Sequence, residues 1–377
     1  MLHHSPNPRI VRLTPLNEAL ERLTSLAAKI DARERPLSQA VGAVLAADII
    51  APAHLPASPV AYADGWAVNA AEVVGASAYS AAILAPPPIW VEADDRMPDG
   101  ADAVLPEDAL TAVAPGMAEA SMSIAPGEGV RNTGQDVAAG TLVMAEGTRV
   151  APRHVGILRA CGFETAMVRT PRVRLVVATA AAARKVDMVR MWLEGAGAEI
   201  LDLLSAPGDR EKLAACYAMP GADLVISLGG TGQGRGDCAV AALGDAGTVE
   251  LQGVALRPGG TATFGRVEGV PVLLLPGRVD GVIAGVLVLA STLLTHISGL
   301  SRPDWHAPSR LTDKASSVIG FTELFLGVPE GDLIRPIPLD EASFDALARA
   351  VGWFTVPPGS EGFAAGDTVH LRPFQPR

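Results

Sequence analysis

The chain has 377 residues, of which 49% are hydrophobic and 19% are charged, so it should form roughly two to four domains with a substantial core. Asp and Glu number 41 against 30 Lys and Arg, which gives a formal net charge of −11. This acidic balance argues against a binder of nucleic acid or acidic membranes, which needs clustered cations to neutralise phosphates, but it leaves room for a small anion in one basic pocket.

The first half of the chain combines apolar residues at helical spacing with segments rich in turns. Leucines three and four residues apart predict a helix over 14–30, with Thr14 as its N-cap, and the same spacing predicts a second helix over 38–49. The other elements expected in this half are a Pro- and Ala-rich loop at 52–62, a small β domain at 66–135 and a short helix at 152–161.

From residue 171 onward, strands and helices alternate. The β-branched run 172–179 is typical of a strand buried on both faces, and the alternation predicts a parallel α/β domain with right-handed crossovers. Further strands are expected at 198–204, 222–230, 248–255 and 270–275. Helices are expected at 186–193, from Asp209, near 237–243 and at 279–297. Residues 302–377, with one helix at 341–351, are expected to form a small α+β or β domain.

Three features indicate a cytoplasmic protein that does not cross a membrane. The apolar run 282–297 is shorter than a typical span and contains polar residues, so we predict a buried core helix. The amino-terminal residues lack the apolar region of a signal peptide. Three widely spaced cysteines, Cys161, Cys216 and Cys238, predict buried free thiols in a reducing compartment and not a disulfide framework or a zinc site.

The strongest candidate site is the glycine-rich segment 229–237, between a predicted strand and a predicted helix. Open α/β sheets bind ligands at the carboxyl ends of their strands, and glycines before a helix N-terminus favour an anion. The spacing matches neither the dinucleotide fingerprint nor a P-loop, because Arg235-Gly236 replaces the required Lys-Ser/Thr. The alternative is a flexible turn with Asp237 as helix N-cap.

Two further loops each carry an arginine. In the first, 257–261, Arg257 can meet a phosphate bidentately; in the second, 275–278, Arg278 stands where a helix N-terminus would face a ligand. Each can also be an ordinary turn with a solvated arginine. Because all three loops follow strands of one predicted sheet, we expect them to converge on one edge.

Asp64 and Asp136 are candidate carboxylates for a metal or a ligand. Each lies beside glycine in a short polar segment, Asp64-Gly65 and Gly134-Gln135-Asp136, and such segments are more often plain turns. The histidines show no metal-binding spacing, so none is assigned as a ligand.

Taken in order, these segments resemble motifs of the molybdopterin molybdenumtransferase family, of the MoeA and gephyrin E-domain type. The order of the motifs extends over nearly the whole chain. The matches are 63–68 to S-x-M-D-G-Y-A, 98–107 to P-x-G-A-D-A-V…E, 130–136 to V-R-x-x-G-E-D, 223–237 to D-L-V-I-x-x-G-G-x-S-x-G-x-x-D, 257–259 to K-P-G-K-P, 275–277 to L-P-G-N-P, and 359–369 to L-x-x-G-D-x-V.

The resemblance implies a multi-domain α/β architecture with four parts. They are a helical or extended N-terminal domain (10–52 plus 135–170), an inserted β domain (53–134), a parallel α/β molybdopterin-binding domain (171–300) and a C-terminal β domain (301–377). Family members are elongated homodimers with the site where the subunits meet. They insert molybdate into adenylylated molybdopterin and release AMP, usually with magnesium.

Carried over residue by residue, the resemblance implies catalytic roles for Asp64, Asp136, Asp237 and Arg257, with Asp64 and Asp237 also as metal ligands. The phosphate of a molybdopterin would lie in the glycine-rich loop and its neighbours. The cofactor-binding residues so implied are Gly229, Gly230, Thr231, Gly232, Gly234, Pro258, Gly259, Pro276, Gly277 and Arg278.

Several family positions differ in this chain. The T-G-D-E-L after the first α/β strand is replaced by an alanine-rich segment at 178–183, so its acidic pair is absent. Arg257 stands for the first Lys of K-P-G-K-P, and Arg278-Val279 for the Asn-Pro of L-P-G-N-P. Losing a charged group that binds only in the transition state typically costs about a thousandfold in rate, so several losses would leave little of the standard reaction.

Two hypotheses follow. The chain is either a divergent molybdate insertase, with Arg257 and Arg278 substituting for the family residues, or a non-catalytic paralogue that binds molybdopterin or the finished cofactor and delivers it to a molybdoenzyme client. The substitutions favour the second slightly. A generic anion- or nucleotide-binding α/β protein outside this pathway is the remaining alternative.

Overall fold

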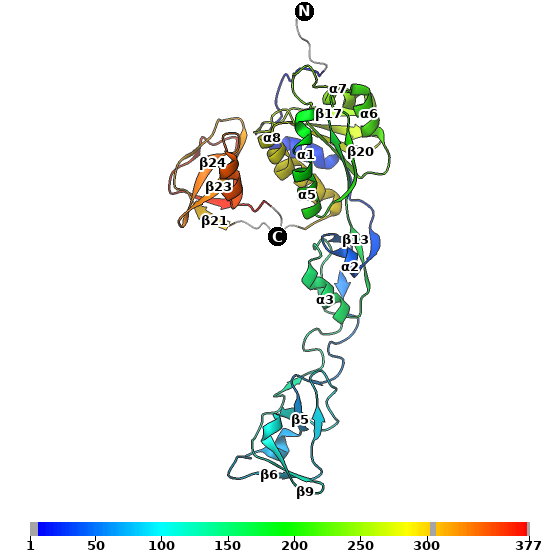
Figure 1. Ribbon diagram of the computed structural model, residues 1–377, viewed down its shortest axis with the longest axis vertical. Helices are drawn as coiled ribbons and strands as arrows, with labels where there is room; N and C mark the ends of the chain where they lie inside the picture. The colour runs from blue at the N-terminus through cyan, green and yellow to red at the C-terminus, as the bar shows by residue number, and fades with distance from the viewer. Residues whose placement is uncertain (1–6, 302–306, 375–377) are drawn as a thin grey trace, which may run out of the picture. The chain divides into compact units, whose positions relative to one another are not determined.

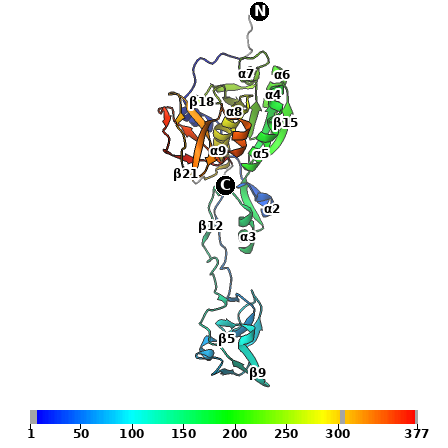
Figure 2. The ribbon, with the colours of Figure 1, turned by 60° about the vertical axis from the view of Figure 1, so that its left-hand side comes forward.

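The computed structural model describes residues 7–301 and 307–374, which form two compact units (Figures 1 and 2). Within the described residues, the first unit comprises residues up to 46, 147–151 and those from 166 onward. The second comprises 47–146 and 152–165. This division is coarser than the four domains expected from the family resemblance, whose boundaries stay a prediction.

A six-stranded sheet forms the centre of the first unit. In spatial order its strands are β15 (Glu199–Ser205), β14 (Arg172–Val177), β16 (Leu224–Leu228), β20 (Val270–Leu275), β19 (Thr263–Val267) and β17 (Thr248–Gln252). The first four run parallel, as the alternation of strands and helices predicts.

The other edge of this sheet is antiparallel, in contrast to the parallel strands and right-handed crossovers predicted for this domain. Strands β19 and β20 are joined by only Glu268 and Gly269, both with positive φ, +50° and +87°. Positive φ at two central residues is typical of a tight hairpin, and two residues are far too few for a helical crossover. Strand β19 was absent from the predicted elements.

Helices cover both faces of the sheet. Alternate residues of β14 face opposite sides: Val173, Leu175 and Val177 pack in one core cluster and Val176 in the other. The first face is covered by α1 (Leu16–Ser25), α5 (Val186–Gly195), α8 (Val279–Ala284), the π-helical turn η3 (Gly285–Ala290) and α9 (Ser291–Ser298). The other is covered by α6 (Arg210–Ala218) and α7 (Ala239–Ala246), which lie side by side (Figures 1 and 2).

The long apolar helix is the core helix that the sequence predicts. Among the described residues, only Val279–Ser298 is long and apolar enough to cross a membrane, and 78% of its most apolar window is buried inside the protein. The cysteine prediction is confirmed in part. All three are free, but only Cys238 is fully buried, while Cys161 and Cys216 are partly accessible.

The amino-terminal prediction needs two corrections. Pro15, not Thr14, occupies the N-cap position of α1, because the Thr14 backbone pairs with Gly253 and Ala255. The helix expected at 38–49 is limited to α2 (Leu37–Ala40), because Gly42 has φ of +88° and turns the chain. Four short strands account for the rest of this region: β1 (Arg33–Pro36), β2 (Val44–Leu45), β13 (Thr165–Arg169), which pairs with both, and β3 (Ile49–Ile50).

The carboxyl-terminal part of the first unit is a β structure with one short helix, as expected. Its main sheet contains β23 (Thr322–Glu330), β24 (Leu333–Pro338), β25 (Gly352–Val356) and the two-residue β18 (Leu256–Arg257). The helix is α10 (Phe344–Arg349). Two smaller ladders pair β21 (Ala307–Arg310) with β27 (Thr368–Leu371) and β22 (Ala315–Ser316) with β26 (Gly362–Phe363).

The second unit contains the small β domain predicted at 66–135, drawn mainly in cyan in Figure 1. One three-stranded sheet is β7 (Ile89–Val91), β5 (Gly65–Val68) and β8 (Ala103–Leu105); another is β6 (Ala82–Leu84), β10 (Met117–Ala120) and β9 (Leu110–Ala114). The remaining elements are β4 (Val60–Ala61) paired with β11 (Val130–Arg131), β12 (Leu142–Met144) paired with β3, the short helices η1 (Ala70–Val73) and η2 (Glu107–Ala109), and α3 (Pro152–Ala160).

Candidate functional site

The carboxyl ends of three neighbouring strands bring their loops together. Val177 of β14 is in register with Leu228 of β16, and Leu228 with Leu275 of β20. Beyond them, the Gly229 N–H donates to the Leu275 carbonyl over 2.9 Å. A Cβ built on Gly277 would lie 3.3 Å from Gly229 Cα. The loops at 229–237 and 275–278 therefore meet at one edge, as the sequence predicts.

Gly229 and Gly230 need to be glycine for steric reasons. Their φ angles are +85° and +76°, in the left-handed region that side chains rarely adopt. A Cβ on Gly229 would collide with the Thr179 hydroxyl, and one on Gly230 would lie 3.0 Å from the Ala239 Cβ. The chain thus passes close to both the end of β14 and the start of α7.

Three consecutive backbone N–H groups of this loop have no acceptor among the described residues. Among the described residues, none accepts a hydrogen bond from the backbone N–H of Gly230, Thr231 or Gly232. Thr231 is only 2% exposed, and buried N–H groups without an acceptor are rare in proteins. Successive free N–H groups beside a helix N-terminus favour an anion.

Asn7 is a component of this loop that the sequence analysis missed. Its side chain is 5% exposed, and its Nδ2 donates to the carbonyls of Gly230 (2.7 Å) and Gly232 (3.0 Å). Its Oδ1 accepts from the Ala241 N–H in the first turn of α7, over 3.2 Å. A lone asparagine more than 200 residues away in sequence carries no local signal for this contact.

Asp237 closes the same loop on itself. Its Oδ2 accepts a 2.7 Å hydrogen bond from the Gly234 N–H, and the N-cap position of α7 belongs to Cys238. The Asp237 carboxylate therefore stabilises the turn at 234–237. The alternative prediction, that Asp237 is the N-cap of the following helix, is wrong. The third predicted loop reaches this one through a 2.8 Å hydrogen bond between the hydroxyls of Thr231 and Thr261.

The Arg257 side chain is paired with two carboxylates, those of Asp340 and Glu323. It begins its loop from β18, which pairs with β23 and is not a strand of the six-stranded sheet. Its Nε lies 3.0 Å from Asp340 Oδ2 and 3.3 Å from Glu323 Oε1. The hydrogen bond with Asp340 is the main cause that raises the pKa of Arg257. No pattern in the sequence signals these two distant partners.

Arg278 is held by a near neighbour. Its guanidinium contacts the buried Asp280 at 3.1–3.3 Å while its own side chain stays 79% exposed. The hydrogen bond that Arg278 donates to Asp280 is the largest cause of the raised pKa of Arg278. Arg184 and Arg235 are exposed on the loops of this edge, and α4 (Ala180–Ala183) contributes only alanines.

Asp64 and Asp136 both belong to the second unit. Asp64 Oδ1 accepts from the Ala93 N–H at 2.8 Å, and Asp136 pairs with Arg131 at 3.3 Å. The Arg131 guanidinium lies 5.3 Å from the centre of the Tyr62 ring, and strands β4 and β11 pair beside it. The two motifs around these acids therefore meet within this unit.

The magnesium expected from the resemblance finds no ready ligand set within either unit. Across residues 7–301 and 307–374 no group of three or more His, Cys, Asp or Glu is placed to hold a metal ion. Asp64, Asp136 and Asp237 are each already hydrogen-bonded to the protein.

Family models match most of the chain. The MoeA N-terminal region (domain I and II) matches residues 14–162, and a probable molybdopterin binding domain matches 178–296. Molybdopterin molybdenumtransferase 2 of Mycobacterium tuberculosis (strain ATCC 25618 / H37Rv) is 30% identical over 383 residues, covering 89% of this chain and 93% of the relative. The molybdopterin molybdenumtransferase of Bacillus subtilis (strain 168) is 26% identical, with 95% and 93% covered.

Solved structures agree at the level of the fold. The molybdopterin biosynthesis MoeA protein of Pyrococcus horikoshii OT3 superposes with a TM-score of 0.75 at 23% identity, over 96% of this chain and 100% of that one. The arrangement is that of multi-domain proteins built around an α/β domain. With the family models and the mycobacterial relative, it shows that this chain belongs to the MoeA family of molybdopterin molybdenumtransferases.

Proposed function

We propose that this chain acts in molybdenum cofactor biosynthesis by binding molybdopterin, or its adenylylated form, without inserting the metal itself. The pterin phosphate would be held at the edge formed by the loops after β14, β16 and β20. The observation that carries this proposal is the set of three adjacent backbone N–H groups, at Gly230, Thr231 and Gly232, that have no acceptor among the described residues.

The charges around this edge favour binding over catalysis. The family's acidic pair is replaced by alanines in α4, and the two arginines that stand for family residues are both held by carboxylates. Arg257 would have to leave Glu323 and Asp340 to act on a substrate oxygen. Leaving Glu323 without its cation in a buried place is costly, so the pair is expected to stay formed.

Metal insertion is the second candidate, and one observation favours it. The mycobacterial relative named as a molybdenumtransferase aligns with this chain over 93% of its own length. In that case molybdate would be a substrate, and Arg257 and Arg278 would serve in place of the family lysine and asparagine. The resemblance also supports a cytoplasmic homodimer and a molybdoenzyme client as parts of the proposal.

One assay separates the two candidates. The purified protein is given adenylylated molybdopterin, molybdate and magnesium, and both bound pterin and released AMP are measured. Pterin bound in about one equivalent per chain, without AMP release above a protein-free blank, is the expected result. Molybdate-dependent AMP release would replace the binding proposal with the insertase. Failure to bind either pterin species would remove both.

A further inference from the structure

Residues 7–14 form a strap between the glycine-rich loop and α1. At the α1 end of the strap, the Thr14 N–H donates to the Gly253 carbonyl over 3.0 Å. The Thr14 carbonyl accepts from the Ala255 N–H over 2.7 Å. These two backbone hydrogen bonds fix the strap to the connection between β17 and β18, and neither of them involves the glycine-rich loop.

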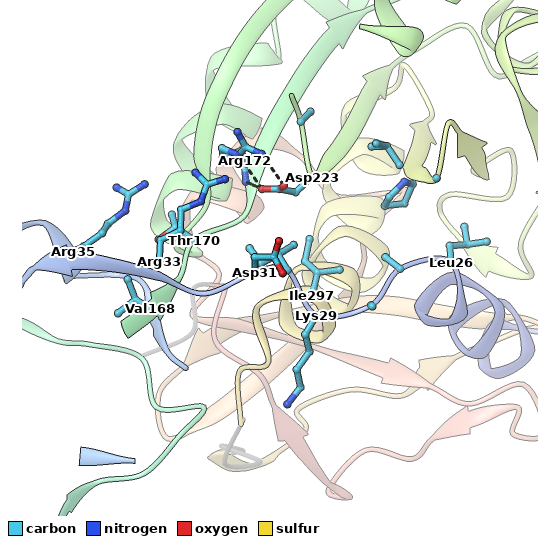
Figure 3. A pocket seen from close by; sticks show the side chains of 17 residues that line it. Leu26, Lys29, Asp31, Arg33, Arg35, Val168, Thr170, Arg172, Asp223 and Ile297 are labelled. Carbon is cyan, nitrogen blue, oxygen red and sulfur yellow. Dashed lines mark hydrogen bonds and ion pairs between the residues drawn. The ribbon is translucent and has the colours of Figure 1, made fainter. Parts of the chain in front are cut away.

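Helix α1, which follows the strap, is anchored in the core. Its residues Ala19 and Leu23 are fully buried and pack in the cluster that covers one face of the sheet. Beyond the helix, Leu26 lines a pocket at the amino ends of the parallel strands, together with the ion pair of Arg172 and Asp223 (Figure 3). The strap therefore extends from a fixed helix toward the carboxyl edge of the sheet, so its other end has a defined position.

At that end, Asn7 holds two peptide groups of the glycine-rich loop. Its side chain is 5% exposed, and its Nδ2 donates to the carbonyls of Gly230 and Gly232 over 2.7 and 3.0 Å. In a trans peptide, the carbonyl of one residue and the N–H of the next point in opposite directions. Asn7 therefore directs the N–H groups of Thr231 and Gln233 away from the strap.

Of these two N–H groups, that of Gln233 is the one placed to meet a dissolved ligand. Thr231 is 2% exposed, whereas Gln233 is an exposed residue. The Gln233 N–H has no acceptor among the described residues. The Gln233 side chain contacts the strap, because its Nε2 donates to the Pro8 carbonyl over 3.2 Å.

We propose that Asn7 is a positioning residue for phosphate binding: it holds the peptide between Gly232 and Gln233 so that the Gln233 N–H donates to a phosphate oxygen. A hydrogen bond to a charged oxygen is stronger than one to a neutral oxygen, and a donor that is oriented before binding loses less freedom when the ligand arrives. Glycines at 232 and 234 let this peptide rotate once Asn7 no longer holds it. The inference rests on the proposed function for the carrier of the phosphate, a molybdopterin.

The backbone amide signal of Gln233 in an NMR spectrum of the isotopically labelled protein reports on this N–H directly. The protein is titrated with inorganic phosphate at constant ionic strength. In the wild type the Gln233 signal should shift saturably, and in Asn7→Ala the dissociation constant from the same titration should rise at least about fivefold.

The matched control is Gln252→Ala. This variant removes another side-chain contact of the strap, the 2.8 Å hydrogen bond from Gln252 Nε2 to the Pro8 carbonyl, and Gln252 lies outside the glycine-rich loop. It should bind phosphate like the wild type. The proposal is overturned by an unshifted Gln233 signal in the wild type, by equal affinity in Asn7→Ala and the wild type, or by equal weakening in the two variants.

Molybdopterin and its dephosphorylated form separate this inference from the proposed function. Asn7→Ala should weaken the binding of molybdopterin at least about fivefold and leave the affinity for the dephosphorylated form unchanged. Equal weakening of both would contradict a role in positioning the phosphate donor. If the wild type fails to bind molybdopterin yet phosphate shifts Gln233 only when Asn7 is present, the proposed function fails and this inference stands. If the wild type and Asn7→Ala bind molybdopterin equally well, the proposed binding stands and this inference fails.

Discussion

Replacing Arg257 with methionine tests whether this arginine serves the protein or a ligand. Its Nε is shared between Asp340 at 3.0 Å and Glu323 at 3.3 Å. The Glu323 side chain is only 4% exposed, and its second oxygen has no hydrogen-bond partner among the described residues. Arg257→Met therefore leaves a buried carboxylate without its counter-ion, while the methionine preserves much of the side-chain volume.

The size of the effect follows from the two contacts. The hydrogen bond to Asp340 contributes about 1.5–3 kcal/mol, and removing the cation from a buried carboxylate such as Glu323 costs about 3–5 kcal/mol in full burial. Because the Arg257 side chain is 41% exposed, water screens part of this interaction, and we expect the free energy of unfolding to fall by about 2–3 kcal/mol. Adding Glu323→Gln removes the stranded charge and should restore about half of the loss.

Urea unfolding of the three proteins measures these changes, with Arg266→Met as the control. Arg266 pairs with Glu250 on the surface at 3.2 Å, and breaking such an exposed pair should cost under about 1 kcal/mol. Molybdopterin affinity is measured on the same samples and should change little in Arg257→Met. If Arg257→Met is as stable as the wild type but has lost pterin affinity, this reasoning is refuted and Arg257 binds the ligand.

Three other changes test the site and its supports. Asn7→Ala removes the hydrogen bonds to the Gly230 and Gly232 carbonyls that hold this loop, and should weaken molybdopterin binding several-fold in a calorimetric titration; unchanged binding would contradict a role for Asn7 in positioning the loop. Gly230→Ala forces a side chain into φ of +76° and should lower the free energy of unfolding by about 1–2 kcal/mol or more, measured in urea; no loss would contradict the steric account. The hydrogen bond from Arg210 lowers the pKa of Asp245, so this pair stabilises the fold above the ordinary aspartate pKa and the stabilisation is lost as pH falls through the lowered value. Melting temperatures below about pH 4 should then fall less steeply in Asp245→Asn than in the wild type, and parallel curves would exclude the pair as a contributor.

Local pattern was enough to predict much of the α/β framework. The β-branched run at 172–179, the capped helix after Asp209 and the apolar helix at 279–297 each express burial or capping that adjacent residues determine. The antiparallel edge was missed because its signal is small: a two-residue turn at Glu268-Gly269 reverses the chain where a crossover was expected.

The position of the candidate site in the sheet could be predicted from the sequence, but the partners of its side chains could not. Glycine-rich and proline-containing loops after strands mark the carboxyl edge of a sheet wherever they occur, so the meeting of the loops at Gly229 and Gly277 followed from the pattern. The partners of Arg257, Glu323 and Asp340, lie more than 60 residues away in sequence. Asn7 and its partner Ala241 are separated by more than 200 residues. Long-range polar contacts of this kind leave no trace in a single sequence.

We propose that this chain binds a molybdopterin phosphate without inserting the metal. The most direct measurement is a single-turnover reaction of the purified protein with adenylylated molybdopterin, molybdate and magnesium, in which bound pterin and released AMP are counted together. We expect about one pterin bound per chain and no AMP release above the protein-free blank. AMP release that depends on molybdate, or the absence of bound pterin, would contradict it.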